Sequence, residues 1–247
     1  MCCLFGFVDY ASSLSVKQKS RLTRELSIAA EARGTDATGV AYNTSRGLQI
    51  YKRPLAAHRL HLRIPAEAHV VMGHTRMTTQ GSAKKNYNNH PFLGCVKGKS
   101  FALARNGVIW NDLELRRTKH LPKTKILTDS YVAVQLLEQQ KSLDFDSLRY
   151  MAEQVEGSFS FTVLDEQDAL WIVKGDSPLS IAYFPECGVY VYASTAEILN
   201  KALTRCGKQL GRRKAVEVEM GDLLKIDRRG HITRATFGAS KLCRPSW

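Results

Sequence analysis

Hydrophobic residues near the start of the chain form one short run and then one helical period. Residues 2–10 are mostly apolar over a strand-length segment, which is typical of a buried strand. Residues 15–34 then repeat apolar side chains at helical spacing, after a Ser15–Gln18 pair that resembles a capping box and before Gly34, which ends the run. The pattern predicts a buried first strand followed by an amphipathic helix.

The next part of the chain alternates strand-length segments with polar turns. Residues 39–43 and 48–52 flank a polar turn and predict a hairpin, and residues 69–74 predict a further buried strand. The stretch 75–91 is polar and aperiodic, as in a loop. Two apolar segments then flank Asn106-Gly107, a dipeptide that favours a tight turn, so a turn is predicted there.

The second half of the chain predicts helices followed by a multistranded antiparallel region. Helices are expected from Thr128 and at 145–155, strands at 158–164, 169–173, 179–184 and 189–193, a helix at 195–206, and strands at 215–219 and 222–227. No repeat or linker marks a boundary, so we expect one domain over residues 1–247, with a core at about 2–200 that the C-terminal strands complete. This order of elements predicts an α+β fold.

Composition places the chain among cytoplasmic proteins. The 247 residues are 44% hydrophobic, which suffices for a large core. No apolar run reaches the roughly 18 residues of a membrane span, and no secretory signal precedes the first strand, so no membrane partner is expected. The 6 cysteines include no Cys-x-x-Cys pair, which favours reduced thiols and no metal.

The net charge of +13 is the global feature that indicates a binding function, because a basic protein attracts polyanions. The basic residues are dispersed and lack the interleaved aromatic side chains of a base-stacking surface. A nucleic-acid partner is therefore not expected. A non-catalytic basic module that binds nucleic acid or nucleotide stays open as the alternative of another class.

Cys2 directly follows the initiator methionine, and this position carries the first chemical signal. Removal of Met1 would leave the thiol beside a free α-amine, whose pKa of about 8 allows it to act as the base. Cys2 would then combine nucleophile and base in one residue. The competing interpretations are a buried small hydrophobic residue and a lipidated Met-Cys-Cys terminus.

Short motifs that follow Cys2 along the sequence favour the catalytic interpretation of Cys2. They are Arg33–Gly39 (RGTDATG), Gly73–Thr79 (GHTRMTT), Asn89–Phe92 (NHPF), Arg105–Gly107 (RNG) and Thr128–Ser130 (TDS). Together with the Met-Cys start they resemble the class II, or Ntn-type, glutamine amidotransferase domain in a standalone form, over roughly residues 2–200. The resemblance implies a four-layer αββα sandwich of the N-terminal nucleophile hydrolase type.

The resemblance also implies a role for each matching residue. Cys2 is the nucleophile, and the Asn106 side-chain amide with the Gly107 backbone N–H forms the oxyanion hole. Arg76 holds the α-carboxylate of the substrate, a task that suits a planar guanidinium. Asp129 receives the α-ammonium.

Five further residues are implied in supporting positions. Thr79 lines the glutamine site, and Arg33 with Asp36 supports the nucleophile. His74 and His90 could suggest a Cys–His dyad or a metal site, but the family uses the terminal amine as base. We therefore expect the two histidines to be structural, with no metal and no cofactor.

Three departures from the family pattern border the expected pocket. Arg105 stands where relatives often have histidine, Tyr131 where they have glutamate, and Met77 where an aromatic residue is frequent. None removes a residue that the resemblance assigns to the chemistry. The three departures therefore affect the prediction of selectivity for free glutamine more than the prediction of amide hydrolysis.

The sequence thus predicts a glutamine amidohydrolase that releases glutamate and ammonia through a Cys2 thioester. About fifty residues follow residue 200, too few for an ammonia-consuming domain, so a separate synthase or transferase subunit is the expected partner. The enzymatic alternative is a γ-glutamyl amide or peptide hydrolase of the same fold, with the same residues acting on a larger substrate.

Overall fold

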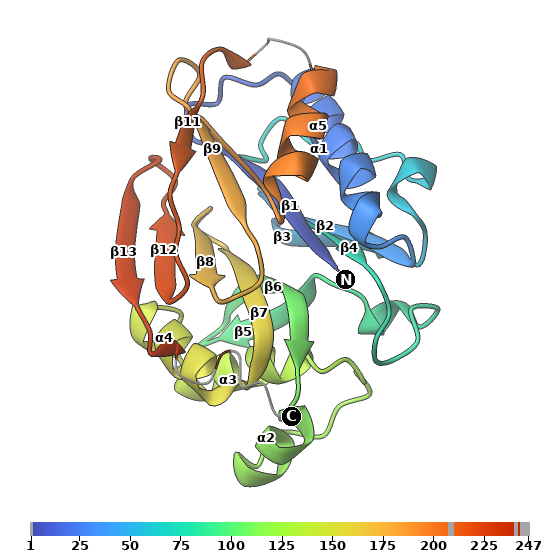
Figure 1. Ribbon diagram of the computed structural model, residues 1–247, viewed down its shortest axis with the longest axis vertical. Helices are drawn as coiled ribbons and strands as arrows, with labels where there is room; N and C mark the ends of the chain where they lie inside the picture. Colours follow the sequence, from blue (N-terminus) through green and yellow to red (C-terminus); the bar gives the residue numbers. More distant parts are fainter. Residues whose placement is uncertain (1, 207–209, 240–241, 243–247) are drawn as a thin grey trace.

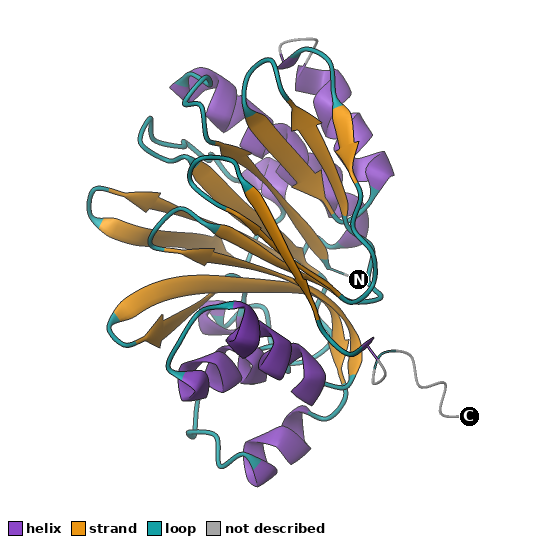
Figure 2. Ribbon diagram, turned by 90° about the vertical axis from the view of Figure 1, so that its left-hand side faces the viewer, coloured by secondary structure: helices purple, strands orange, loops and turns teal. Residues whose placement is uncertain are grey.

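The computed structural model describes residues 2–206, 210–239 and 242. Within them, two antiparallel sheets face each other, and helices cover the outer face of each sheet (Figure 1; Figure 2). This arrangement confirms the predicted four-layer αββα sandwich.

The first sheet has the strand order β11-β9-β10-β1-β4-β2-β3. Its strands are β1 (Cys3–Asp9), β2 (Ala37–Thr44), β3 (Gly47–Arg53), β4 (Val70–Arg76), β9 (Ser180–Phe184), β10 (Val189–Ala193) and β11 (Lys214–Val216). The second sheet has the order β13-β12-β8-β7-β6-β5. Its strands are β5 (Phe92–Val96), β6 (Lys99–Ile109), β7 (Gly157–Asp165), β8 (Leu170–Lys174), β12 (Asp222–Ile226) and β13 (Ile232–Thr236). The C-terminal strands therefore extend both sheets.

Helices α1 (Val16–Ala30) and α5 (Ala196–Cys206) pack on the first sheet, and α3 (Tyr131–Gln140) and α4 (Phe145–Gln154) pack on the second. The remaining helical segments are α2 (Asp112–Thr118), η1 (Glu31–Arg33), η2 (Ala57–Arg59) and η3 (Asn86–Asn88). The predicted capping box of α1 is confirmed, because the Ser15 N–H donates to Gln18 Oε1 (2.9 Å) and the Gln18 N–H donates to Ser15 Oγ (3.3 Å).

Apolar side chains fill the three spaces between the four layers. Strand β1 separates two of them by simple alternation: Cys3, Phe5 and Phe7 face α1 and α5, whereas Leu4 and Val8 lie between the sheets. The prediction that Cys3 is a core residue is confirmed. Since β1 is the central strand of its sheet, the fold holds the start of the chain between the two sheets.

The turn predicted at Asn106-Gly107 is wrong, because β6 continues through both residues. Strand β6 pairs with β7 from Phe101 to Ile109, with Asn106 opposite Ser160 and Gly107 opposite Phe159. Pairing with a neighbouring strand overrides the local turn preference of the dipeptide. Strands β5 and β13 and helix α2 were also not predicted from the sequence pattern.

We expect Gly107→Ala to lower the free energy of unfolding by about 3 kcal/mol, as for other substitutions that strain the backbone and overpack the core. Gly107 has φ +128°, and an added Cβ would lie 1.9 Å from the Ser158 carbonyl oxygen. The matched control is Gly98→Ala, at φ +79° with open space around the added Cβ. Urea unfolding of both variants measures the difference, and equal losses would contradict the steric explanation.

No helix among the described residues combines the length and the hydropathy needed to cross a membrane.

Candidate active site

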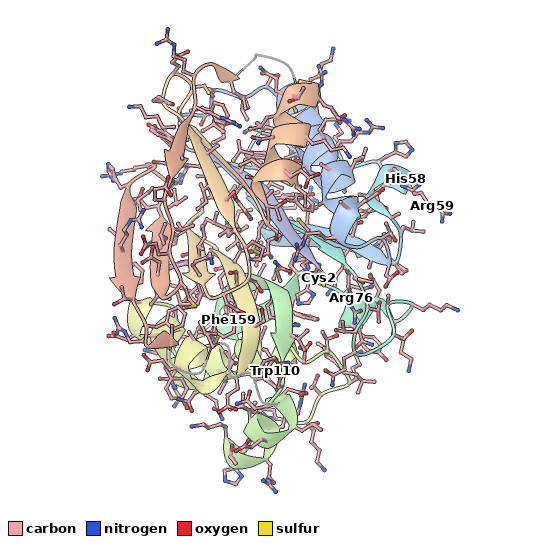
Figure 3. All side chains as sticks on the ribbon, viewed as in Figure 1. Cys2, His58, Arg59, Arg76, Trp110 and Phe159 are labelled. Atoms are coloured by element: carbon pink, nitrogen blue, oxygen red, sulfur yellow. The ribbon has the colours of Figure 1, made fainter. Side chains whose placement is uncertain are left out.

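Cys2 directly precedes β1, where the central strand of the first sheet begins (Figure 1). Its side chain is 8% exposed, and its Sγ lies 3.6 Å from the Met77 carbonyl oxygen in the loop after β4. Figure 3 shows Arg76, the last residue of β4, next to Cys2. Met1 lies outside the described residues, so its removal stays a prediction.

Arg33 connects Cys2 to the second sheet. Its Nε donates to the Cys2 carbonyl oxygen (2.8 Å), and its Nη2 donates to Asn106 Oδ1 (3.3 Å). A guanidinium has only donors, so the oxygen of the Asn106 amide must face Arg33. The amide nitrogen is consequently turned away from Arg33.

The Asn106 Nδ2 group is buried and has no hydrogen-bond acceptor among the residues that the structure describes. Leaving such a donor unpaired costs about 1–3 kcal/mol, so native proteins rarely keep one without a use. One guanidinium thus contacts both Cys2 and Asn106, and it leaves the Asn106 amide nitrogen as an unpaired, buried donor.

Arg76 is 2% exposed, and its guanidinium is already engaged by the loop that follows β4. Nη1 donates to Asn89 Oδ1 (2.6 Å), and Nη2 donates to the carbonyl oxygens of Gln80 and Gly81. These bonds close the loop onto the site. A substrate carboxylate would have to share or replace these acceptors, and the predicted carboxylate-binding role of Arg76 stays a prediction.

Asp36, another predicted site residue, is hydrogen-bonded to the loop after β4, and Thr79 lies in that loop. Asp36 Oδ2 accepts from the Thr78 N–H (2.7 Å), and the Asp36 N–H donates to the Arg76 carbonyl oxygen (2.9 Å). Asp36 thus fixes the chain beside Arg76. Thr79 is exposed in the same loop, and its predicted contact with substrate stays a prediction.

Asp129 lies just before α3, where its carboxylate meets β6. Arg105 Nη2 lies 3.0 Å from Asp129 Oδ1 and 2.9 Å from Oδ2, and the Ile109 N–H donates to Oδ2 (2.7 Å). The side chains of Arg105 and Asp129 are 3% and 1% exposed. In the sequence Arg105 stands out only as a departure from the family pattern, and its ion pair with Asp129 was not predicted. A charged residue within the apolar strand sequence around Arg105 was the available signal, since a buried charge needs a partner.

His74 and His90 contact each other through their rings, with ring centroids 4.2 Å apart and ring planes inclined by 34°. His74 Nε2 donates to the Arg105 carbonyl oxygen (2.9 Å), which fixes the neutral tautomer with hydrogen on Nε2. Burial lowers the pKa of His74 from 6.5 to about 3 and that of His90 well below its usual value. Both rings are therefore neutral near pH 7. No group of three or more His, Cys, Asp or Glu side chains that could hold a metal occurs in the described part of the chain.

We expect stability to fall as the pH decreases below 6.5, because the unfolded chain then protonates His74 and the folded protein, with a pKa of about 3, does not. The slope for one such histidine approaches about 1.4 kcal/mol per pH unit. His74→Gln keeps an N–H donor and removes the titration, so its urea midpoint should vary less between about pH 6.5 and about pH 4.5. Identical pH slopes for both proteins would contradict a neutral, buried His74.

Lys52, at the end of β3, is a second charged residue that the sequence analysis did not connect to the site. Its Nζ donates to the carbonyl oxygens of Asn89 and Pro91, and burial together with the nearby Arg76 lowers its pKa to about 8. Lys52 thus lies near Arg76, which in turn lies near Arg105 and Cys2. Fixed positive charge in a buried site favours the negative charge that develops on oxygen during amide hydrolysis.

Comparison with known proteins agrees with this geometry. The model of a family described as "Glutamine amidotransferase domain" matches residues 74–201. Glutamine–fructose-6-phosphate aminotransferase (isomerizing) of Sulfurisphaera tokodaii is 31% identical over 190 residues, which are 73% of this chain and 31% of that protein. The 7-cyano-7-deazaguanine synthase of Sulfolobus acidocaldarius is 26% identical over 204 residues, which are 78% of this chain and 43% of that protein. The chain thus spans less than half the length of these curated relatives.

A solved structure extends the likeness to nearly the whole chain. Glutamine phosphoribosylpyrophosphate amidotransferase of B. subtilis superimposes with a TM-score of 0.74 at 19% identity, covering 98% of this chain and 51% of that one. At this identity the likeness shows the fold. The family model covers more than half of the residues, and the predicted class II, Ntn-type fold is present. The chain therefore belongs to the glutamine amidotransferase domain family.

Proposed function

We propose that this domain hydrolyses the side-chain amide of glutamine through a thioester on Cys2. After removal of Met1, the α-amine takes the proton of the thiol, and the sulfur attacks the amide carbon. Asn106 Nδ2 and the Gly107 N–H stabilise the oxyanion, and the α-ammonium returns its proton to the departing ammonia. Water then hydrolyses the thioester, which releases glutamate and the free thiol.

The single observation that carries this proposal is the arrangement of Cys2, Arg33 and Asn106. Arg33 binds the backbone of Cys2 and the amide oxygen of Asn106, which leaves the amide nitrogen unpaired in a buried position. The amide nitrogen of a structural asparagine is normally paired, as Asn43 Nδ2 is with the Asp165 carbonyl oxygen and Asp168 Oδ1. An oxyanion donor, in contrast, must stay unpaired until the intermediate forms.

The proposal is tested by glutamate release from glutamine, measured together with the intact mass of the purified protein. We expect activity in protein that has lost Met1, because only then is the α-amine of Cys2 free. Full activity in protein that retains Met1 would overturn the role of the amine as base.

We further propose that the ammonia passes to a separate synthase or transferase. Two of the curated relatives are named as an aminotransferase and a synthase, which supports an acceptor reaction that consumes the ammonia. Affinity capture with the wild-type protein should recover an acceptor enzyme. Adding that enzyme to the purified domain should raise the rate of glutamate release. Full activity alone, with no acceptor recovered, would speak against this partner.

A γ-glutamyl peptide is the second candidate substrate. Met77, which is 52% exposed, replaces a frequent aromatic residue beside Cys2, and a flexible thioether accommodates varied leaving groups. Turnover of glutamine and of γ-glutamyl dipeptides by the same preparation separates the two candidates. A higher kcat/KM for the dipeptides would identify them as the substrates.

A further inference from the structure

The carboxylate of Asp129 has no free capacity for a substrate ammonium group. Oδ1 lies 3.0 Å from Arg105 Nη2 and 3.4 Å from Ser130 Oγ, whereas Oδ2 accepts from the Ile109 N–H (2.7 Å) and lies 2.9 Å from the same Nη2. A carboxylate has about four acceptor positions, and these contacts use them. Arg105 is held in this place by a further bond from its Nε to Ser130 Oγ (2.8 Å).

The electrostatics around Asp129 oppose an ammonium group as well. Arg105 neutralises the carboxylate, and its Nη1 is a buried donor without an acceptor among the described residues. Arg76 and Lys52 add positive charge on the neighbouring elements. An ammonium group at this place would meet a guanidinium at close range in a site shielded from water, where like charges repel strongly. An uncharged group, or one that accepts a hydrogen bond, suits this environment.

We infer that Arg105 prevents Asp129 from binding a substrate ammonium group. The site therefore hydrolyses the side-chain amide of glutamine-like substrates whose α-nitrogen is uncharged or absent at least as well as it hydrolyses glutamine. This inference rests on the proposed function. Arg105 is the specificity-determining residue. Asp129 acts through it, as the anion that positions the guanidinium.

The test compares glutamine with glutaramic acid, which has the same chain, carboxylate and amide but no α-amino group. We expect the two kcat/KM values of the wild type to agree within about threefold, because no pocket group pairs with the ammonium. A preference for glutamine above about tenfold would overturn the inference, since a site that binds the amino group rejects the analogue that lacks it.

Two variants sharpen the comparison. Arg105→His introduces the residue that the family pattern has here and frees Asp129, so the preference for glutamine should rise at least about tenfold. Asp129→Asn should lower both kcat/KM values by the same factor, because its loss disturbs Arg105 and not a substrate contact. The ratio of two substrates on one protein cancels any loss of folded enzyme. A selective loss of glutamine turnover in Asp129→Asn would contradict the inference.

Failure of the proposed hydrolysis can be distinguished from failure of the inference about Arg105. If Met1-processed wild type releases ammonia from neither amide, and intact mass shows no acyl group on Cys2, the proposed hydrolysis itself fails and the inference falls with it. If both amides acylate Cys2 but glutamine is strongly preferred, the hydrolysis stands and only the role of Arg105 is overturned.

Discussion

Glutamate release is expected to fall at least about 10⁴-fold when Cys2 is replaced by alanine, because the thioester route then has no nucleophile. Cys2 lies at the start of the central strand β1 with its Sγ beside the Met77 carbonyl oxygen, so the smaller side chain leaves β1 in place. The measurement is the steady-state rate of glutamate formation with saturating glutamine. Circular dichroism and the thermal midpoint establish that the variant is folded.

Cys95→Ala is the matched control, since Cys95 is an exposed free thiol on β5. It should keep the wild-type rate. Equal losses in both variants would indicate a general effect of cysteine removal, and substantial activity in folded Cys2→Ala would refute the proposed nucleophile.

Asn106→Ala is expected to lower kcat by about 10²–10³-fold with little change in KM, which is the effect of removing one oxyanion donor. The amide nitrogen of Asn106 has no partner in the described structure, so it can bind an oxyanion without giving up an existing bond. Because that bond forms only in the transition state, kcat and kcat/KM should fall together. Initial rates over a range of glutamine concentrations separate the two constants.

Asn43→Ala provides the control for Asn106→Ala. Asn43 Nδ2 also connects the two sheets, donating to the Asp165 carbonyl oxygen (2.7 Å) and to Asp168 Oδ1 (2.8 Å), but it lies at the opposite end of β2 from the Cys2 site. Its replacement should cost stability while kcat changes little. A large loss of kcat in Asn43→Ala, or a rise in KM alone in Asn106→Ala, would contradict the oxyanion assignment.

Arg105 distinguishes this domain from relatives that have histidine at the same position. Its ion pair with Asp129 occupies the place that the family resemblance assigns to the substrate ammonium, so a match of motifs does not carry the same specificity. In the proposed mechanism the ammonia-producing chemistry is assigned to Cys2, Asn106 and Gly107, none of which contributes a side chain to this ion pair. Of the residues in this proposal, Arg105, Asn106 and Gly107 are consecutive on strand β6, whereas Cys2 directly precedes β1.

The sequence by itself determined the elements whose pattern is local. The apolar run of β1 and the capping box and helical period of α1 are properties of short segments, and the structure has both. The ordered motifs indicated the family and, through the resemblance, identified Cys2, Arg76, Asn106 and Asp129 as candidate site residues.

Only the tertiary structure decided how those residues are used. Asn106-Gly107 became the interior of β6 because β7 pairs across it, which local turn preference cannot anticipate. Arg105 and Asp129 are 24 residues apart and meet only when α3 packs on the second sheet. The energy of such a buried pair depends on the distance between the two charges and on the exclusion of water, and the sequence alone gives neither. The sequence thus determined which groups are available, and packing decided which of them are already paired and which are left for a substrate.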